Sequence, residues 1–409
     1  MSSSMNVVIV GNGVAGVTAA RIIKAQNQEA QVSIYTDEGY QYYPRPRLYE
    51  VLAGEAEPQE VYLFSEEWYK KQGINIQLNT KASSIDTDKK ELLLENGTKV
   101  NYDKLLLANG GHSFVPPIKG VEKTGVFTLR TIKDALNIKD YTRKTKKVIV
   151  IGGGLLGLEF AYSLKKLGQQ VEVVEMFPRL LPRQLDTDGA IILKKRIEAL
   201  GISIVLGVKT VEILGKQTVS GILLDSGKTL SGDVVLISAG VRSNIGLAQE
   251  AGIKVNRGIV VDGHLRTSAD DVYAAGDVAE FNGMVYGIIP AALEQATVAA
   301  ANIVGNENSI YTGTMASNTL KIVDIDLTSM GIVNPEEPKY EEIKNADTQK
   351  GVYKKLVLDK GKIVGAILLG TKKGVISLKK LMTQKTDITK YKNSILNDNF
   401  DYKKIPGLT

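Results

Sequence analysis

The 409-residue sequence predicts an α/β protein with two similar parallel-sheet domains and a C-terminal α+β domain. A pattern of strand, glycine-rich turn, helix and strand occurs at the N-terminus, and the same pattern returns from residue 147. Residues 318–370 alternate in the manner of strands, which are expected at 319–325, 353–358 and 362–369, and a lysine-rich helix follows. A chain of this length is too long for one ordinary domain, so two or three are expected.

The first pattern contains every part of a dinucleotide-binding fingerprint. Residues 6–10 are a β-branched run typical of a strand buried on both faces. A helix is expected at 17–24, and a second strand at 31–35 is followed by the acids Asp37 and Glu38. The turn between strand and helix, GNGVAG, supplies three glycines, Gly11, Gly13 and Gly16. In this fingerprint they permit the tight turn, the approach of backbone to a pyrophosphate, and close packing of helix on strand. The complete context predicts a Rossmann-like domain.

The second pattern repeats these parts. A strand at 147–151 and a helix at 158–167 flank the turn GGGLLG, whose glycines are Gly152, Gly154 and Gly157. Two fingerprints indicate either two dinucleotide sites or one site and a relic. The next strand ends at Glu175, and an acid there accepts hydrogen bonds from a ribose diol and repels a 2′-phosphate. The sequence therefore favours NADH over NADPH, although Arg179 and Arg183 would weaken the preference.

Composition excludes several kinds of chemistry. The absence of cysteine excludes disulfides, thiolate zinc sites, cysteine-ligated iron–sulfur clusters and redox-active thiols in this chain. Two histidines are too few for a histidine-rich metal site, so no metal is expected. No apolar run reaches the length of a membrane span, and the first six residues lack the charged region of a signal peptide. A cytoplasmic protein without a membrane partner is expected.

Positive charge is concentrated at the C-terminal end. Residues 351–409 hold 13 lysines and 4 aspartates, a net charge of +9, whereas the whole chain carries +6, so the remaining residues sum to −3. Such a basic end suits an acidic partner protein or nucleic acid, or it is simply a solvated surface.

Two further segments contain candidate site residues. Residues 260–277 are interpreted as strand, turn and strand, ending at Asp277, which would otherwise serve as a helix N-cap. The stretch from Ile289 and Pro290 is expected to begin a helix of small residues that runs to about Val304, and Pro290 suits the first helical position. The N-terminus of this helix would offer a positive dipole to an anionic ligand edge.

The motifs together resemble a known family. GNGVAG, YYPRPRL, LLLANGG, GGGLLGLE, SAGVRSN, TSADDVYAAGD and NTLKIVDIDLTSMG follow one another over nearly the whole chain. They are similar to those of FAD-dependent pyridine nucleotide-disulfide oxidoreductases related to glutathione reductase. Within that superfamily they look most like NADH:rubredoxin oxidoreductases and the NADH-binding part of nitrite reductases. The resemblance implies an FAD domain at 1–112 and 239–308, an NADH domain at 113–238 and a C-terminal α+β domain at 309–409.

The resemblance also implies positions for both cofactors. Arg45 would contact FAD near the phosphates or the flavin, Asp277 would accept a ribityl hydroxyl, and two backbone amides would face the flavin pyrimidine. The second glycine turn would hold the NADH pyrophosphate. The implied cofactor-binding residues are Gly11, Gly13, Gly16, Asp37, Glu38, Arg45, Ala108, Gly110, Asp277, Pro290, Ala291, Ala292, Gly152, Gly154, Gly157, Glu175 and Gly240.

Two glutamates are the candidate catalytic residues. By resemblance, Glu159 lies beside the nicotinamide and helps to place the hydride-bearing carbon against the flavin; otherwise it is a solvated helix residue. Several relatives have a lysine where this sequence has Glu50, and that lysine pairs with the glutamate. If the alignment holds, Glu50 and Glu159 are neighbours, one of them is protonated, and Arg47 or Lys321 replaces the missing cation.

The expected function is transfer of electrons from NADH through FAD to a one-electron carrier, an acidic protein such as rubredoxin. The lack of cysteine argues against relatives that use a redox cysteine, such as disulfide reductases, NADH peroxidases and water-forming oxidases. Other acceptors remain open, namely a nitrite reductase-like system or oxygen. A second alternative is an NADH-responsive flavoprotein of the apoptosis-inducing factor type. No nucleic acid partner is expected, and a monomer and a homodimer are both compatible with the sequence.

Overall fold

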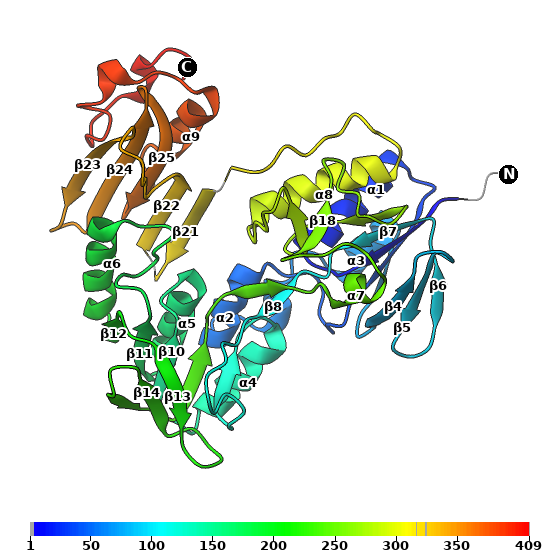
Figure 1. Ribbon diagram of the computed structural model, residues 1–409, viewed down its shortest axis with the longest axis horizontal. Helices are drawn as coiled ribbons and strands as arrows, with labels where there is room; N and C mark the ends of the chain where they lie inside the picture. Colours follow the sequence, from blue (N-terminus) through cyan, green and yellow to red (C-terminus); the bar gives the residue numbers. More distant parts are fainter. Residues whose placement is uncertain (1–3, 316, 324, 409) are drawn as a thin grey trace.

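The structure is a computed structural model that describes residues 4–315, 317–323 and 325–408. Figure 1 shows three lobes, which are called here the first, second and third domains. The first carries the N-terminus, and the third carries the C-terminus and lies beside the second. No helix of the described residues is long and apolar enough to cross a membrane.

The first domain is built on a parallel sheet in the order β19-β7-β1-β2-β3. Its core strands are almost fully buried on both faces, which explains their β-branched and leucine-rich composition. Helices α1 and α8 pack against each other on this sheet. The elements are β1 (Asn6–Val10), α1 (Val14–Gln26), β2 (Gln31–Tyr35), α3 (Glu66–Gln72), β3 (Ile74–Gln77), β4 (Ala82–Asp86), β5 (Glu91–Leu94), β6 (Lys99–Asn101), β7 (Lys104–Leu107), α7 (Gly246–Glu250), β18 (Ile259–Val261), β19 (Val272–Ala274), β20 (Ala279–Phe281) and α8 (Ile289–Ile303).

The second domain repeats this architecture with the parallel sheet β12-β11-β10-β16-β9. A three-stranded antiparallel meander, β13-β14-β15, completes it. The elements are β9 (Val126–Thr128), α4 (Ile132–Thr142), β10 (Lys147–Ile151), α5 (Leu155–Lys166), β11 (Gln170–Glu175), α6 (Thr187–Ala199), β12 (Ile202–Leu206), β13 (Thr210–Leu214), β14 (Gly221–Leu224), β15 (Thr229–Ser231) and β16 (Val234–Ile237). The two predicted sheets are therefore confirmed. Both fingerprint helices begin three residues earlier than expected, because the third glycine of each turn lies inside the helix.

The third domain is an antiparallel sheet in the order β21-β22-β25-β24-β23, with α9 packed on β25. The elements are β21 (Ser317–Ile322), β22 (Ile325–Gly331), β23 (Glu341–Asp347), β24 (Val352–Asp359), β25 (Lys362–Leu369) and α9 (Val375–Gln384). The single strand expected at 319–325 is wrong, because a turn at Val323 divides it into β21 and β22. Strand β23 was missed because its polar sequence lies at the sheet edge, largely exposed, and lacks the apolar alternation of a half-buried strand.

Two chain crossings join the first and second domains. Strands β8 (Gly111–Ser113) and β17 (Val241–Ser243) pair antiparallel there, so the expected boundary after residue 112 falls inside β8. Helix α2 (Leu48–Ala53) lies in sequence between β2 and β3 of the first domain, but it packs on α4 and α5 of the second domain. Its apolar residues share one hydrophobic core with the second domain and with one face of the third-domain sheet.

Candidate functional site

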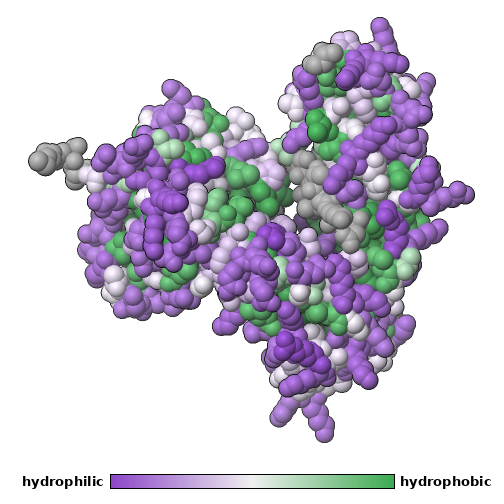
Figure 2. Space-filling model, turned by 180° about the vertical axis from the view of Figure 1, so that it is seen from behind, coloured by the Kyte–Doolittle hydropathy of each residue, from purple (hydrophilic) through white to green (hydrophobic). Residues whose placement is uncertain are grey.

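A cavity of about 1660 Å³ lies where the three domains meet. Most of its wall comes from the first domain, including the first glycine turn and the segment 35–46. The second domain adds the first turns of α5, and the third adds Ser329, Gly331 and Lys379. Figure 2 shows hydrophobic side chains gathered on the part of the first domain that faces the other two. Exposed apolar residues on and before α8, such as Met284, Ile289 and Leu293, belong to this domain.

The first glycine turn is shaped by two close approaches and one open position. A Cβ atom on Gly11 would lie 2.3 Å from the carbonyl oxygen of Ala108, and one on Gly16 would lie 2.0 Å from that of Gly11. A Cβ on Gly13 would meet nothing within 4 Å. Gly11, Gly13, Ala108 and the neighbouring Gly110 line the cavity, whereas Gly16 lies behind the turn. The turn thus leaves its backbone open to a ligand at Gly13.

Asn12, in the middle of this turn, carries a polar atom without a partner in the described structure. Its side-chain oxygen accepts a hydrogen bond of 2.9 Å from the hydroxyl of Tyr69, which is fully buried. Its amide nitrogen is buried and unpaired, and the buried side-chain oxygens of Gln41 and Asn109, also in the cavity wall, are unpaired as well. Buried polar groups are normally satisfied, so these atoms indicate a polar ligand.

The acids after β2 take different positions. Asp37 is exposed at the cavity rim. Glu38 accepts hydrogen bonds from the Tyr43 hydroxyl, at 2.5 Å, and from the guanidinium of Arg45, with which it forms an ion pair. Arg45 also donates to the carbonyl oxygen of Arg130 at 2.9 Å. Arg45, expected to face a cofactor, therefore lies in the cavity wall but is tied to Glu38.

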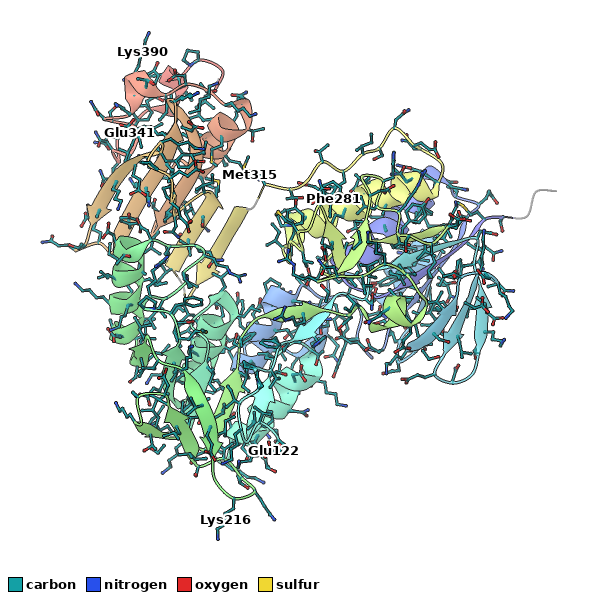
Figure 3. All side chains as sticks on the ribbon, in the orientation of Figure 1. Glu122, Lys216, Phe281, Met315, Glu341 and Lys390 are labelled. Atoms are coloured by element: carbon teal, nitrogen blue, oxygen red, sulfur yellow. The ribbon has the colours of Figure 1, made fainter. Side chains whose placement is uncertain are left out.

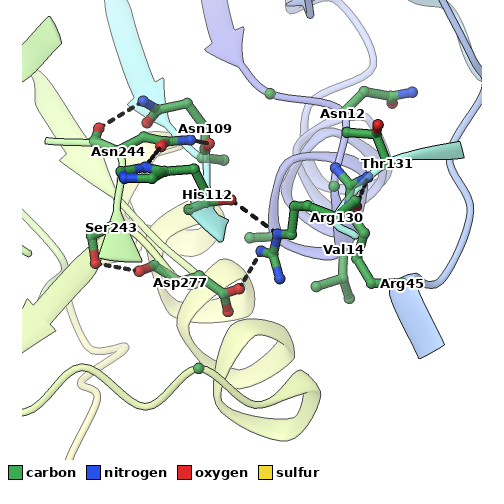
Figure 4. A pocket seen from close by; sticks show the side chains of 18 of the residues that line it. Asn12, Val14, Arg45, Asn109, His112, Arg130, Thr131, Ser243, Asn244 and Asp277 are labelled. Carbon is green, nitrogen blue, oxygen red and sulfur yellow. Dashed lines mark hydrogen bonds and ion pairs between the residues drawn. The ribbon is translucent and has the colours of Figure 1, made fainter. Parts of the chain in front are cut away.

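Asp277 is held by a cation that the sequence analysis missed. Its carboxylate forms an ion pair of 2.8 Å with Arg130, and its carbonyl oxygen accepts a hydrogen bond from the hydroxyl of Ser243 (Figure 4). Arg130 also donates to the carbonyl oxygen of Gly111 at 2.9 Å. The available signal was the capping box at the start of α4, whose N-cap is the next residue, Thr131. That cap fixes the chain direction so that the preceding side chain points into the cavity.

The start of α8 corrects one expectation. Pro290 lines the cavity, as does Ile289, while the side chains of Ala291 and Ala292 are buried, with exposed fractions of 1% and 2%. The amide of Ala292 donates to the carbonyl oxygen of Ile288 at 3.1 Å, so it is not available to a ligand. The reason is that Ile288 is the N-cap, so Pro290 is the second helical residue rather than the first, and only the first three residues of the helix have amides without internal partners.

The second glycine turn has the same two close approaches and the same open position as the first. A Cβ atom on Gly152 would lie 2.3 Å from the carbonyl oxygen of Ser238, and one on Gly157 would lie 2.0 Å from the carbonyl oxygen of Gly152. A Cβ atom on Gly154 would meet nothing within 4 Å. Glu175 is buried and accepts amide hydrogen bonds from Gly153 at 2.7 Å and Phe177 at 2.8 Å. These glycines and Glu175 do not line the large cavity, although α5, which begins at this turn, does. Gly240, in the second crossing, is also outside it and accepts from the amide of Phe114.

The two candidate catalytic glutamates occupy different settings. Glu159 lines the cavity and accepts a hydrogen bond of 2.8 Å from the amide of Val323 in the third domain. Glu50 lies outside the cavity lining and receives two hydrogen bonds, of 2.9 and 2.6 Å, from the guanidinium of Arg47. Burial raises the pKa of Tyr49, and the negative charges of Glu50 and Glu159 raise it further, so both carboxylates lie near this tyrosine.

Arg47 therefore neutralises Glu50 rather than Glu159. Because Glu50 forms this bidentate pair, the structure gives no reason to expect that one of the two glutamates is protonated. The catalytic role of Glu50 stays a prediction, and its position outside the cavity lining does not favour that role. The side chain of Lys321, the other suggested cation, lies outside the described residues. Within the described residues no group of three or more histidine, aspartate or glutamate side chains could hold a metal ion.

Comparison with known proteins identifies the family. The protein-family model described as pyridine nucleotide-disulphide oxidoreductase matches residues 5–302. The chain belongs to this family. Residues 317–386 match a second model, described as the rubredoxin NAD+ reductase C-terminal domain. The family resemblance of the motifs is thereby confirmed, and so is the division into two Rossmann-like domains and an α+β domain.

The similar proteins are named for different functions. The chain is 37% identical over 383 residues to an NAD(P)H nitrite reductase of Bacillus subtilis, covering 93% of this chain and 48% of that protein. It is 32% identical to the NADH-rubredoxin oxidoreductase of Clostridium acetobutylicum, covering 90% and 93%. The crystal structure of a ferredoxin reductase from Rhodopseudomonas palustris superimposes with a TM-score of 0.88 at 26% identity over 98% of this chain and 99% of that one. The chain thus spans about half the length of its nitrite reductase relative.

FAD and NADH are the cofactors of this family, and the residues present fit both. The cavity exceeds the roughly 300–1,000 Å³ of ordinary small-ligand pockets, which suits an extended dinucleotide and a second ligand beside it. The open position at Gly13 and the unpaired polar atom of Asn12 suit a phosphate-bearing ligand at the first turn. The second turn has the same open position at Gly154.

Proposed function

We propose that this chain is an FAD-dependent NADH oxidoreductase that passes electrons to a one-electron carrier protein, most simply an acidic protein such as rubredoxin. The observation that carries the proposal is the shared cavity: the first fingerprint and Glu159, on the helix of the second fingerprint, line one space. Two cofactors bound at the two turns would therefore have their reactive ends in the same cavity. The chain contains no cysteine that could pass electrons to a thiol substrate.

Each part of the proposed site has a separate task. The first turn and Asn12 bind the FAD pyrophosphate, and the Arg130–Asp277 pair offers both a donor and an acceptor to the cofactor chain. The second turn binds NADH, and Glu159 orients the nicotinamide end at the cavity wall. FAD, when bound, supplies the acceptance of a hydride and the release of single electrons. The hydrophobic side chains around α8 keep water from this region.

The third domain offers a surface for an acidic carrier. Helix α9 carries Lys379, at the cavity edge, and Lys380, both exposed, and Ile376, whose exposed fraction is 85%. An apolar centre with positive charges beside it is the composition that steers and docks an acidic redox protein. The match of this domain to the rubredoxin NAD+ reductase C-terminal domain supports the same partner.

A second acceptor is favoured by the comparison with nitrite reductases. Because the chain spans about half of a relative with 37% identity, it corresponds to an electron-input portion of that protein. In that case the acceptor would be a separate nitrite-reducing component rather than rubredoxin. The proposed hydride-accepting site is the same in both candidates.

The first experiment is anaerobic stopped-flow mixing of the FAD-loaded protein with NADH and, separately, with NADPH, followed by addition of rubredoxin. Fast flavin bleaching by NADH and rapid reoxidation by rubredoxin are expected. Bleaching without reoxidation by rubredoxin would show that NADH reduces the flavin but that rubredoxin is not the electron acceptor. Slow or absent bleaching would contradict the reductase and favour an NADH-responsive binding protein.

Charge reversal then tests the docking surface. Lys379→Glu/Lys380→Glu is expected to slow reoxidation by rubredoxin at low ionic strength by about tenfold, because Lys379 lies at the cavity edge and Lys380 is the next residue of α9. Lys390→Glu is the matched control, since this exposed lysine lies at the far end of the third domain (Figure 3). Equal effects of both variants would show general charge attraction rather than docking at α9.

A further inference from the structure

One hydrogen bond of the described residues joins the third domain to a glutamate of the second domain in the cavity wall. The amide of Val323 donates to Oε1 of Glu159 at a distance of 2.8 Å. Val323 lies in the turn between β21 and β22, and Glu159 lies in the second turn of α5. The contact therefore joins the third domain to a cavity-lining residue of the second.

The turn is held against the second domain by its own side chains. Val323 has an exposed fraction of 2% and belongs, with Ile325 and Leu327, to the hydrophobic core shared with α5 and α6. Its φ angle of 51° is in the left-handed region, which a β-branched residue rarely adopts. A strained residue persists only where its surroundings fix it, so burial holds this amide in place.

A polar cluster outside the cavity joins the same two domains, and it is buried except at Glu342. We call it the interdomain cluster, and its members are Asp186, Glu342, Tyr353 and Lys355. The Tyr353 hydroxyl donates to Asp186 Oδ2 at 2.6 Å, and the Lys355 ammonium lies 3.1 Å from the same oxygen and 2.7 Å from Glu342 Oε1. Tyr353 and Lys355 have exposed fractions of 1% and 2%, so the cluster tolerates little displacement of one domain on the other.

We propose that Val323 is a positioning residue for Glu159, and that the third domain thereby sets the geometry of the nicotinamide end of the cavity. The backbone amide orients the carboxylate, and the interdomain cluster holds the turn that presents the amide. The missing lysine at position 50 is consistent with this arrangement, because Glu50 is paired with Arg47 and a contact from another domain orients Glu159 instead. The proposal rests on the proposed function, in which Glu159 borders the nicotinamide.

Hydrogen–deuterium exchange tests the contact without using activity. In the FAD-loaded protein, a peptide containing Val323 should exchange about tenfold faster in Glu159→Ala than in the wild type, because a hydrogen bond to a charged acceptor is lost. Glu159→Gln should keep most of the protection, since its amide oxygen also accepts. Wild-type protection of this peptide in Glu159→Ala would overturn the proposal, whether or not the protein reduces its flavin with NADH.

A double-mutant cycle tests the coupling to the domain interface. Tyr353→Phe removes the hydroxyl bonded to Asp186 and is expected to lower the limiting rate of flavin reduction by NADH about fivefold, but less than twofold in a Glu159→Ala background. Tyr391→Phe is the matched control, because its hydroxyl bonds to the carbonyl oxygen of Lys404 inside the third domain. Equal effects of Tyr353→Phe in both backgrounds would overturn the coupling.

Folding is checked by thermal unfolding, and Lys355→Met replaces Tyr353→Phe if the latter does not fold. Failure of the proposed function is distinguishable from failure of this inference. A wild-type protein that NADH does not bleach contradicts the reductase, while the exchange measurement still decides whether Val323 and Glu159 are bonded.

Discussion

Adding one methyl group at Gly157 should disturb the second domain before any ligand binds. The Cβ atom would lie 2.0 Å from the carbonyl oxygen of Gly152 and 3.4 Å from Cβ of Ser238. Ordinary contacts require well over 3 Å, so α5 or the turn must move by roughly 1 Å. Overpacking of this kind costs about 1–3 kcal/mol, which lowers Tm by roughly 3–10 °C for a domain of this size.

The matched substitution is Gly154→Ala, three residues earlier. A Cβ there meets nothing within 4 Å, and the residue has φ −80° and ψ −179°, an extended conformation open to any residue. Alanine is a poorer N-cap than glycine by about 0.5–1 kcal/mol. The lower conformational entropy of the unfolded alanine chain offsets about 0.4–1 kcal/mol, so the net change in stability should be small. If the NADH pyrophosphate approaches the backbone at this turn, as proposed, the methyl group would obstruct it and the Kd for NADH should rise by about tenfold or more.

Circular dichroism melting and fluorescence titration with NADH separate the two effects. Gly157→Ala should lower Tm, whereas Gly154→Ala should keep Tm and lose affinity. A wild-type Tm for Gly157→Ala would refute the packing argument, and NADH binding within twofold of wild type for Gly154→Ala would refute a dinucleotide at this turn. Gly16→Ala and Gly13→Ala repeat the design for FAD retention, since the Cβ distances there are the same, 2.0 Å and open space.

Three further substitutions test the walls of the site and the domain interface. Arg130→Ala removes the cation 2.8 Å from Asp277 and should reduce FAD retention on gel filtration about tenfold; full retention would contradict a cofactor role for the pair. If Glu175 accepts the ribose diol of NADH, as expected from the sequence, Glu175→Ala should narrow the ratio of the NADPH and NADH Kd values about tenfold, and an unchanged ratio would reject that role. Burial alone would raise the pKa of Asp186, but hydrogen bonds, first of all from Tyr353, outweigh it and lower the pKa below its usual range. Stabilisation by this carboxylate is then present above about pH 4 and lost as pH falls through the folded pKa, so the Tm difference between wild type and Asp186→Asn should shrink below about pH 4. A difference that does not change from pH 7 to pH 3 would contradict this.

Local rules predicted the parts of the structure that depend on neighbouring residues. The two glycine turns, their strands and helices, and the strands β24 and β25 of the third domain follow from spacing and alternation, and these are present. Other features depend on residues distant in sequence. Arg130 reaches Asp277 across 147 positions, and the turn at Val323 interrupts a run of strand-forming residues because it packs on another domain. Neither contact leaves a periodic signal in the sequence.

The position of Glu50 shows where alignment by spacing fails. Its place five residues after Arg45 gives the register of the short helix α2, but not the partner that its side chain meets. Helix α2 leaves the first domain and packs on α4 and α5, and there an i,i+3 pair with Arg47 takes up the carboxylate. Glu159 instead accepts a hydrogen bond from a residue 164 positions farther along the chain, and the hydrophobic core that presents this residue joins α2 and the second and third domains. Changes in the packing of the third domain should therefore reach the cavity through Glu159 rather than through Glu50.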